Sequence, residues 1–304
     1  MSPVDEIVLR FDRNSLWLLN GILGLVMFGV ALDLKLEDFR RVASSGRPAL
    51  LGLGTQLLLL PAITFLLVSW IEPAPSMALG AFLVAACPGG TVSNFLAHLA
   101  RGNTALSVTM SAVSTMAAAL TTPFNLALWG SLYPPTRNLL REVNLDPMDI
   151  ALTVALILGL PILLGMGVAH RQPGLAARLR RPLRALSLVV FAAFVLGALA
   201  ANFDHFLTHI GMVAGLVLVH NSLALGCGYG VARVFGLAEA DRRALAIEVG
   251  IQNSGLGLLL IFTFFEGLGG MALVAAWWGV WHLISGLSLA TYWSRRNPTG
   301  EVET

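Results

Sequence analysis

Long apolar runs separated by short polar connections dominate this chain of 304 residues. Because unpaired backbone groups are too costly in lipid, a run of about 20 apolar residues predicts a membrane-crossing helix. Nine such runs predict an all-α polytopic membrane protein with nine transmembrane helices: residues 15–32, 49–70, 77–100, 104–130, 150–170, 186–203, 207–235, 244–264 and 271–293. Only 12% of the residues are charged, about half the usual share of a soluble domain, which agrees with a surface that faces lipid.

Basic residues are distributed unevenly over the loops that nine spans would create. Of the 19 Lys and Arg residues, 15 fall on the side of the loop that follows the first run. Because basic loops are retained in the cytoplasm, the N-terminus is predicted outside and the C-terminus inside the cytoplasm. We expect a multi-pass protein of the cell inner (plasma) membrane, whose partner surface is the lipid bilayer and no nucleic acid.

Two of the nine runs are interrupted by polar motifs that contain glycine. The third run contains Pro88, Gly89 and Gly90; proline lacks a backbone N–H, and each glycine costs about 1 kcal/mol in a helix interior. The eighth run places Glu248 beside two carboxamides and a hydroxyl, and an acid at the centre of a span costs about 2.5–3.5 kcal/mol on insertion scales. Both motifs predict broken helices.

The two interrupted runs occupy corresponding places in the chain. Each is the middle run of three, within residues 49–130 and residues 207–293, and the two groups start from opposite sides of the membrane. This pattern predicts inverted repeats whose two broken helices meet and cross near the midplane. Half-helix N-termini suit an anion, and half-helix C-terminal carbonyls suit a cation.

Glu248 is the acidic residue that lies clearly inside an apolar run. Intramembrane acids usually face a cavity or a partner, so a binding role is favoured over a neutral packing role. Its neighbours offer oxygen atoms rather than a cluster of thiolates or imidazoles, and oxygen ligands select hard cations. The eighth run therefore predicts a cation site.

Other polar side chains are candidates for the same site. Ser107 and Ser111 lie one turn apart on one face of the fourth run. Taken alone, the two serines are best explained by close helix packing. When Ser93, Asn94 and Glu248 are also considered, a role as cation ligands becomes the better interpretation. Gln56 in the second run leaves an interhelical hydrogen bond and a ligand role equally open.

Three histidines within the predicted spans are candidates for a role in mid-membrane: His98, His220 and His282. None has a carboxylate three or four residues further on, so a hydrogen-bonded interior histidine is favoured over a proton relay for each. His282 lies near the middle of the last run and is the best of the three as a cavity residue.

Motifs along nearly the whole chain resemble those of the bile acid:sodium symporter family, in the same order. They are residues 27–29, 55–56, 87–94, 99–108, 248–256 and 281–286. The resemblance implies a core domain, residues 46–132 and 207–294, built around two broken crossing helices. It also implies a panel domain beside it, residues 15–32 and 148–206.

The resemblance further implies two Na⁺ sites and an anion site at the crossing. The first sodium site would use Ser93, Asn94, Ser107, Ser111 and Glu248. The second would use Gln56, Glu248 and Gln252, with the backbone carbonyls of Val249 and Ile251. The anion would lie near Thr91 and Asn253, with His282 lining the cavity.

The expected function is sodium-coupled symport that imports an organic anion, a bile acid or a smaller carboxylate, by alternating access. Bacterial relatives commonly have ten spans, and they often carry Asn where Leu283 stands and Tyr where His98 stands. The two side-chain differences leave the identity of the substrate open.

Other functions remain as alternatives. A carrier of the same fold driven by protons, or one that carries another oxyanion, is the nearest. An intramembrane hydrolase is disfavoured because no set of nucleophile, base and orienting group is apparent. A receptor or scaffold is disfavoured because the chain has no soluble signalling domain. We therefore expect no enzymatic activity.

Overall fold

A computed structural model describes residues 15–32, 46–142, 147–183, 185–186, 189, 203–265 and 267–298 of the chain. Within these residues the structure is helical and contains no β-strand; Gly89 and Gln252 form an isolated bridge. The all-α class predicted from the apolar runs is thus confirmed for the part of the chain that is described.

Most of the helices begin and end close to the predicted runs. They are α1 (Ser15–Ala31), α3 (Arg47–Gly54), the π-helical turn η1 (Thr55–Leu59), α4 (Leu60–Ile71), α5 (Pro75–Ala86), α6 (Thr91–Leu99), α7 (Thr104–Leu132), α8 (Pro134–Glu142), α9 (Pro147–Arg171), α11 (Phe203–Val234), α12 (Glu239–Gly250), α13 (Ser254–Phe264) and α14 (Gly269–Ser294). Residues 173–183 form a further helical segment.

Four helical stretches among the described residues are long and apolar enough to cross a membrane. They are Arg47–Ile71, Thr104–Leu132, Gly211–Val234 and Gly269–Ser294. Shorter apolar helices include Pro75–Ala86 and Ser254–Phe264, which are halves of the two broken runs. The sixth predicted run, residues 186–203, lies almost entirely outside the described residues, so the count of nine spans stays a prediction.

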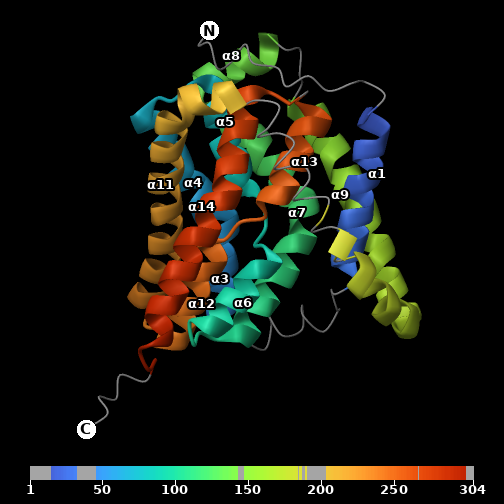
Figure 1. The fold of residues 1–304 in the computed structure, drawn as a ribbon, viewed down its shortest axis with the longest axis vertical. Coiled ribbons are helices and arrows are strands. Elements are labelled where there is room, and N and C mark those ends of the chain that lie inside the picture. Colours follow the sequence, from blue (N-terminus) through green and yellow to red (C-terminus); the bar gives the residue numbers. More distant parts are fainter. Residues whose placement is uncertain are drawn as a thin grey trace.

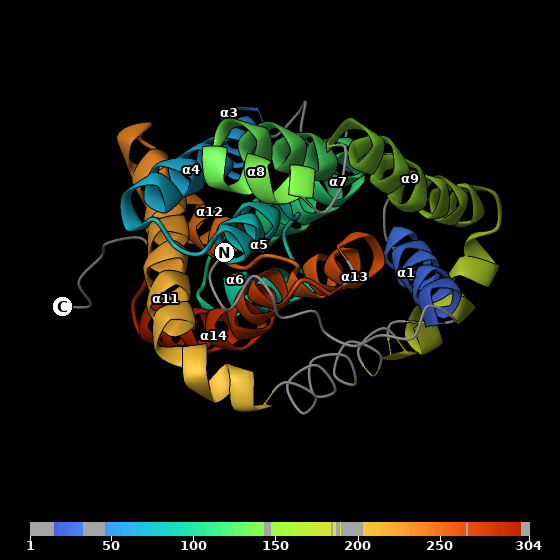
Figure 2. The same cartoon turned by 90° about the horizontal axis from the view of Figure 1, so that it is seen from above.

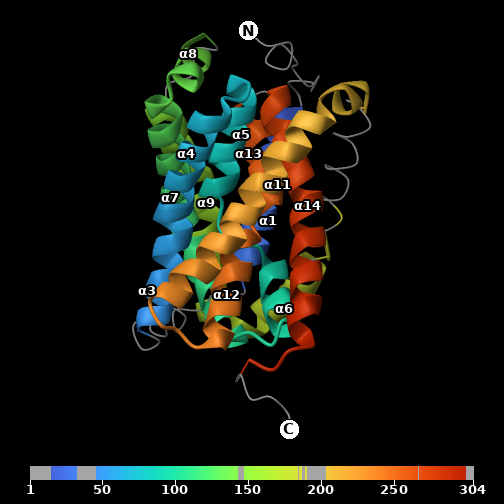
Figure 3. The same ribbon diagram turned by 90° about the vertical axis from the view of Figure 1, so that its left-hand side faces the viewer.

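The two broken helices run in opposite directions through the molecule. Figure 1 shows α5 and α13 in the upper half and α6 and α12 in the lower half, so one chain segment descends through the middle while the other ascends. Figure 3 shows the same division from the side. Each of the four half-helices is 9 to 12 residues long, and their inner ends therefore meet at mid-height.

Helices α1 and α9 pack against each other at one side of the molecule (Figure 2). From there α9 contacts α7, and α1 contacts α13. These two helices belong to the predicted panel domain, whereas the other elements that they contact belong to the predicted core. The boundary between core and panel stays a prediction, because much of residues 148–206 falls outside the described part.

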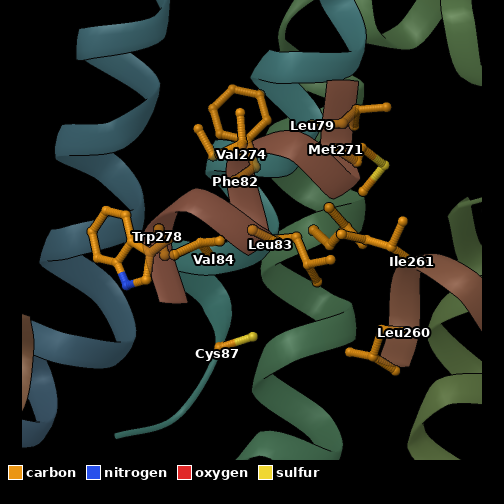
Figure 4. Packing of buried hydrophobic residues seen from close by; sticks show 14 of the residues in the cluster. Leu79, Phe82, Leu83, Val84, Cys87, Leu260, Ile261, Met271, Val274 and Trp278 are labelled. Carbon is orange, nitrogen blue, oxygen red and sulfur yellow. The ribbon is translucent and has the colours of Figure 1, made fainter. Parts of the chain in front are cut away.

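Apolar side chains from three elements hold the upper halves of the broken helices in place (Figure 4). They are Leu79, Phe82, Leu83 and Val84 of α5, Leu260 and Ile261 of α13, and Met271, Val274 and Trp278 of α14. A Cβ atom on Gly80 would lie 2.9 Å from the Cα atom of Met271, so the backbones of α5 and α14 approach closely. Small residues at such contacts let membrane helices gain packing energy.

Two local features were not predicted from the sequence. One is the π-helical turn Thr55–Leu59 within the second run. The other is the short helix α8, which follows α7 and buries Leu139 and Leu140 against α5 and α7. Helix α8 was not predicted because its nine residues are rich in polar side chains and do not resemble a membrane span.

Candidate functional site

The two helix breaks face each other and pair through their backbones. Gly89 and Gln252 form an antiparallel bridge. On either side of it, Gly90 N–H donates to the carbonyl of Ile251 at 3.1 Å, and Asn253 N–H donates to the carbonyl of Pro88 at 2.9 Å. The breaks therefore satisfy part of each other's backbone, as irregular backbone at membrane depth requires.

Gly89 is required at this crossing by lack of space. A Cβ atom added there would overlap the Glu248 carboxylate and would lie 3.3 Å from the Gln56 amide nitrogen. The absence of a side chain lets the extended segment between α5 and α6 pass directly beside both polar groups. The glycine that breaks the third run thus also makes room for the site.

Polar side chains cap the last carbonyl of the first half of each broken helix. The Thr122 hydroxyl of α7 donates to Ala86 O at the end of α5, at 2.7 Å. The Asn221 amide of α11 donates to Gly250 O at the end of α12, at 2.8 Å, and Ser285 donates to the Asn221 carbonyl oxygen at 2.6 Å. These caps were not predicted from the sequence; polar residues in apolar runs were the available signal.

Five of the predicted ligands lie together beside the breaks. Glu248 in α12 is fully buried, and its Oε2 atom lies 2.7 Å from the hydroxyls of Ser93 and Ser107. Its Oε1 atom lies 2.5 Å from the Ser111 hydroxyl. The Asn94 carbonyl oxygen lies 2.9 Å from Ser107 Oγ and 3.2 Å from Ser111 Oγ. Residues from α6, α7 and α12 thus form one oxygen cluster.

This oxygen cluster has more acceptors than hydrogens. Each of its three hydroxyls carries one hydrogen and lies within hydrogen-bond distance of two acceptor oxygens. Ser93 Oγ faces Gly90 O at 2.6 Å as well as the carboxylate, and the two hydroxyls of α7 each face both Asn94 and the carboxylate. Lone pairs that no hydrogen can satisfy, around a buried carboxylate, are an environment that a cation would stabilise.

The predicted second ion site contains two carboxamides with buried atoms that have no hydrogen-bond partner. Both polar atoms of the Gln56 side chain are buried without a partner, and so is Gln252 Oε1. Gln252 Nε2 donates to the carbonyl of Val249 at 2.8 Å, and the carbonyl of Ile251 accepts from the third run. Unpaired buried amides cost roughly 1–3 kcal/mol each, so a group that pairs with them would stabilise the folded state.

The predicted anion residues are less closely grouped. Helix α6 begins at Thr91, whose side chain lies outside the described part of the structure. Asn253 caps α13 by accepting from Leu256 N–H at 3.1 Å, so its carbonyl oxygen is committed to the helix. His282 is buried and its ring is perpendicular to that of Trp278, with 6.5 Å between centroids.

The chemistry of the site is dominated by oxygen. Within the described residues, no group of three or more His, Cys, Asp or Glu side chains could hold a metal ion. Cys87 is buried at the end of α5 and is a free cysteine. It belongs to no cluster of potential metal ligands among the described residues. The donor set therefore matches hard cations rather than transition metals.

The chain is also similar in sequence to known proteins. The family model described as the sodium bile acid symporter family matches residues 21–209. The chain is 32% identical to an uncharacterised sodium-dependent transporter of Bacillus subtilis, over 95% of this chain and 88% of that protein. It is 30% identical to a probable chloroplastic sodium/metabolite cotransporter of Arabidopsis thaliana, over 93% of this chain and 68% of that protein. A rat sodium/bile acid cotransporter is also 30% identical, over 77% of this chain and 52% of that protein.

Proposed function

Since this chain belongs to the sodium bile acid symporter family, and is thus a multi-pass membrane transporter and not an enzyme, we propose that it imports an organic anion together with Na⁺ by alternating access. The anion is a bile acid or a smaller carboxylate. The observation that carries the proposal is the excess of acceptor oxygens around the buried Glu248 carboxylate.

The first Na⁺ binds among the oxygens of Ser93, Asn94, Ser107, Ser111 and Glu248. A buried carboxylate without a counter-charge is costly, and a monovalent cation removes that cost. When the ion binds, the hydroxyls can turn their hydrogens toward Gly90 O and the Asn94 carbonyl, which lie within 2.6 to 3.2 Å of them. With a sodium ion bound, every acceptor oxygen in the cluster has either the ion or a hydroxyl hydrogen as its partner.

The second Na⁺ binds between the carboxamides of Gln56 and Gln252, the other face of Glu248, and the carbonyls of Val249 and Ile251. The buried amide atoms without a partner support this assignment. Gln56 and Glu248 both lie beside Gly89, which pairs with Gln252 through the backbone. Both ions share Glu248, so binding of one ion changes the affinity for the other through that carboxylate.

The anion binds at the start of the half-helices, near Thr91 and Asn253, with His282 lining its cavity. Helix α6 begins after Gly90, which has no side chain to cap the first N–H groups. Free N–H groups at a helix start attract a negative charge. Sodium ions held by residues of η1, α6, α7 and α12, and an anion at the amino ends of α6 and α13, would stabilise one common arrangement of the crossing.

The expected energetics favour import. Two Na⁺ and a monovalent anion carry one net positive charge inward, and the membrane potential then contributes about 2.3 kcal/mol per 100 mV. The excess of Lys and Arg on one side supports an outside N-terminus and a cytoplasmic C-terminus in the cell membrane. Movement of α1 and α9 relative to the crossing helices would expose the site to each side in turn.

Uptake into proteoliposomes tests the proposal. The purified protein is reconstituted, and uptake of labelled cholate, pantoate and pyruvate is measured under an inward Na⁺ gradient, an inward choline gradient, or an inward proton gradient. We expect uptake of at least one anion that depends on Na⁺ and increases with an inside-negative potential. Uptake that follows the proton gradient and ignores Na⁺ would refute sodium coupling, as would equal uptake in Na⁺ and choline.

A further inference from the structure

The Gln56 carboxamide projects from an unusual stretch of backbone. Within the π-helical turn Thr55–Leu59, the N–H group of Leu60 donates to the carbonyl of Thr55, five residues earlier. Compared with an α-helix of 3.6 residues per turn, the additional residue rotates the helix before it by roughly 100° relative to the helix after it. The direction of Gln56 relative to α4 therefore depends on this turn, and π-turns recur at functional sites.

The carbonyl of Leu57, inside this turn, lacks its usual helical donor. The residue four positions later is Pro61, which has no N–H group. Asn125 of α7 supplies a replacement: its Nδ2 atom donates to Leu57 O at 3.1 Å, and also to Thr121 O of its own helix at 2.9 Å. Asn125 is 5% exposed, so neither carbonyl exchanges this donor for water easily.

The orientation of the Asn125 amide is determined by a third residue. Trp129 Nε1 lies 3.0 Å from Asn125 Oδ1. An indole nitrogen only donates, so the atom facing it is the carbonyl oxygen and the NH₂ group must face Leu57. The Trp129 ring in turn packs on Phe65 of α4, with 5.2 Å between centroids.

We propose that Asn125 is a positioning residue for the Gln56 carboxamide, and hence for the second sodium site, an inference that rests on the proposed function. By donating to Leu57 O, Asn125 stabilises the π-helical turn that directs Gln56 toward Gly89 and Glu248. Helix α7 therefore serves both ion sites: Ser107 and Ser111 bind at the first, and Asn125 orients the ligand of the second.

Equilibrium binding of ²²Na⁺ to the purified full-length protein tests this inference without a known organic substrate. The variants are N125L, which keeps the side-chain size but removes the donor, Q56L, which removes the ligand, and the double variant. The matched control is T121V, because the Thr121 hydroxyl only donates within its own helix, to Ala117 O at 3.0 Å. The melting temperature of each variant in choline is measured in parallel.

We expect N125L to weaken ²²Na⁺ binding about tenfold, in the same component of the binding curve that Q56L removes. The double variant should bind no more weakly than Q56L alone, because a positioning residue has no effect once its ligand is absent. T121V should bind as the wild type does. The proposal is overturned if N125L binds ²²Na⁺ as tightly as the wild type. It is also overturned if the losses of N125L and Q56L add in the double variant, or if T121V loses as much affinity as N125L.

A second variant keeps the test decisive if N125L does not fold. W129F retains the aromatic packing on Phe65 but removes the N–H group that orients the Asn125 amide. It should weaken the same binding component severalfold, and an unchanged ²²Na⁺ affinity would contradict the inference. Failure of the proposed function looks different, since then the wild type itself would bind no ²²Na⁺ above a choline background.

Discussion

The Ser107 hydroxyl of α7 lies 2.7 Å from Glu248 Oε2 of α12, although 141 residues separate the two in the sequence. Both side chains are completely buried. The contact joins the first group of three apolar runs to the second at the level of the helix breaks. It brings the carboxylate against a hydroxyl whose single hydrogen is also within reach of the Asn94 carbonyl.

Replacing Glu248 by Gln should abolish stabilisation of the protein by Na⁺. The carboxamide has nearly the same shape but no charge to balance the ion, and folded-state ligands raise stability by RT ln(1 + [L]/Kd). In a melting experiment in detergent, the wild type should melt at a higher temperature in Na⁺ than in choline, and E248Q should melt at the same temperature in both salts.

The matched control for that experiment is E239Q. Glu239 stands at the start of the same helix, at the end opposite the break, where it pairs with Arg243 at 3.1 Å. E239Q should keep the Na⁺-dependent difference in melting temperature. A full Na⁺ shift in E248Q would contradict the assignment of Glu248 to both sodium sites.

Replacing Ser107 by Ala should weaken Na⁺ binding without preventing folding. The substitution removes one oxygen from the cluster, and a contact of this kind to a charged group contributes about 1.5–3 kcal/mol, which equals roughly a ten- to hundredfold loss of affinity. The measurement is the Na⁺ concentration that gives half of the maximal thermal shift. S288A is the control, because the exposed Ser288 hydroxyl only donates to Ile284 O of α14.

Replacing Gly89 by Ala should destabilise the crossing, because the new methyl group would overlap the Glu248 carboxylate. Overpacking of this kind costs about 1–3 kcal/mol. By contrast, G226A in α11 adds a Cβ atom with nothing within 4 Å, and Ala exceeds Gly in helix stability by about 0.5–1 kcal/mol. Unfolding midpoints in denaturant should therefore move in opposite directions. Equal midpoints for the two variants would argue against the close passage of Gly89.

Replacing Asn221 by Leu should lower stability by about 1–3 kcal/mol, because Gly250 O would lose its buried donor. S285A should cost less, since it removes only the hydroxyl that orients Asn221. The two substitutions act on one hydrogen-bonded chain, so their effects on the free energy of unfolding should not add. Additive effects would show that the Asn221 cap works independently of Ser285.

Much of the fold follows from local patterns along the chain. Runs of apolar residues predict helices in lipid without knowledge of any contact, since each helix satisfies its own backbone. Pro88 and the two glycines after it also predict a break locally, because the missing N–H and the conformational freedom act within one helical turn. The structure breaks both helices at the motifs.

The same patterns indicate which residues are candidates for the site, but they do not predict how the side chains are arranged in it. Glu248 stands out because a charge in an apolar run is rare. Asn221 and Asn125 are also polar residues in apolar runs, yet nothing local distinguishes a residue that caps a carbonyl from one that binds an ion. Their partners, Gly250 and Leu57, are known only when the helices are packed together.

The sequence by itself determined the helical class, the approximate bounds of most described helices and the positions of the two breaks, because hydrophobic periodicity and backbone propensity are local properties. Only the tertiary structure decided that the breaks pair through Gly89 and Gln252. It also decided that α7 places two hydroxyls against Glu248, and that a π-helical turn carries Gln56. Such contacts join segments that are far apart in the chain, and the close packing of whole helices determines which of them meet.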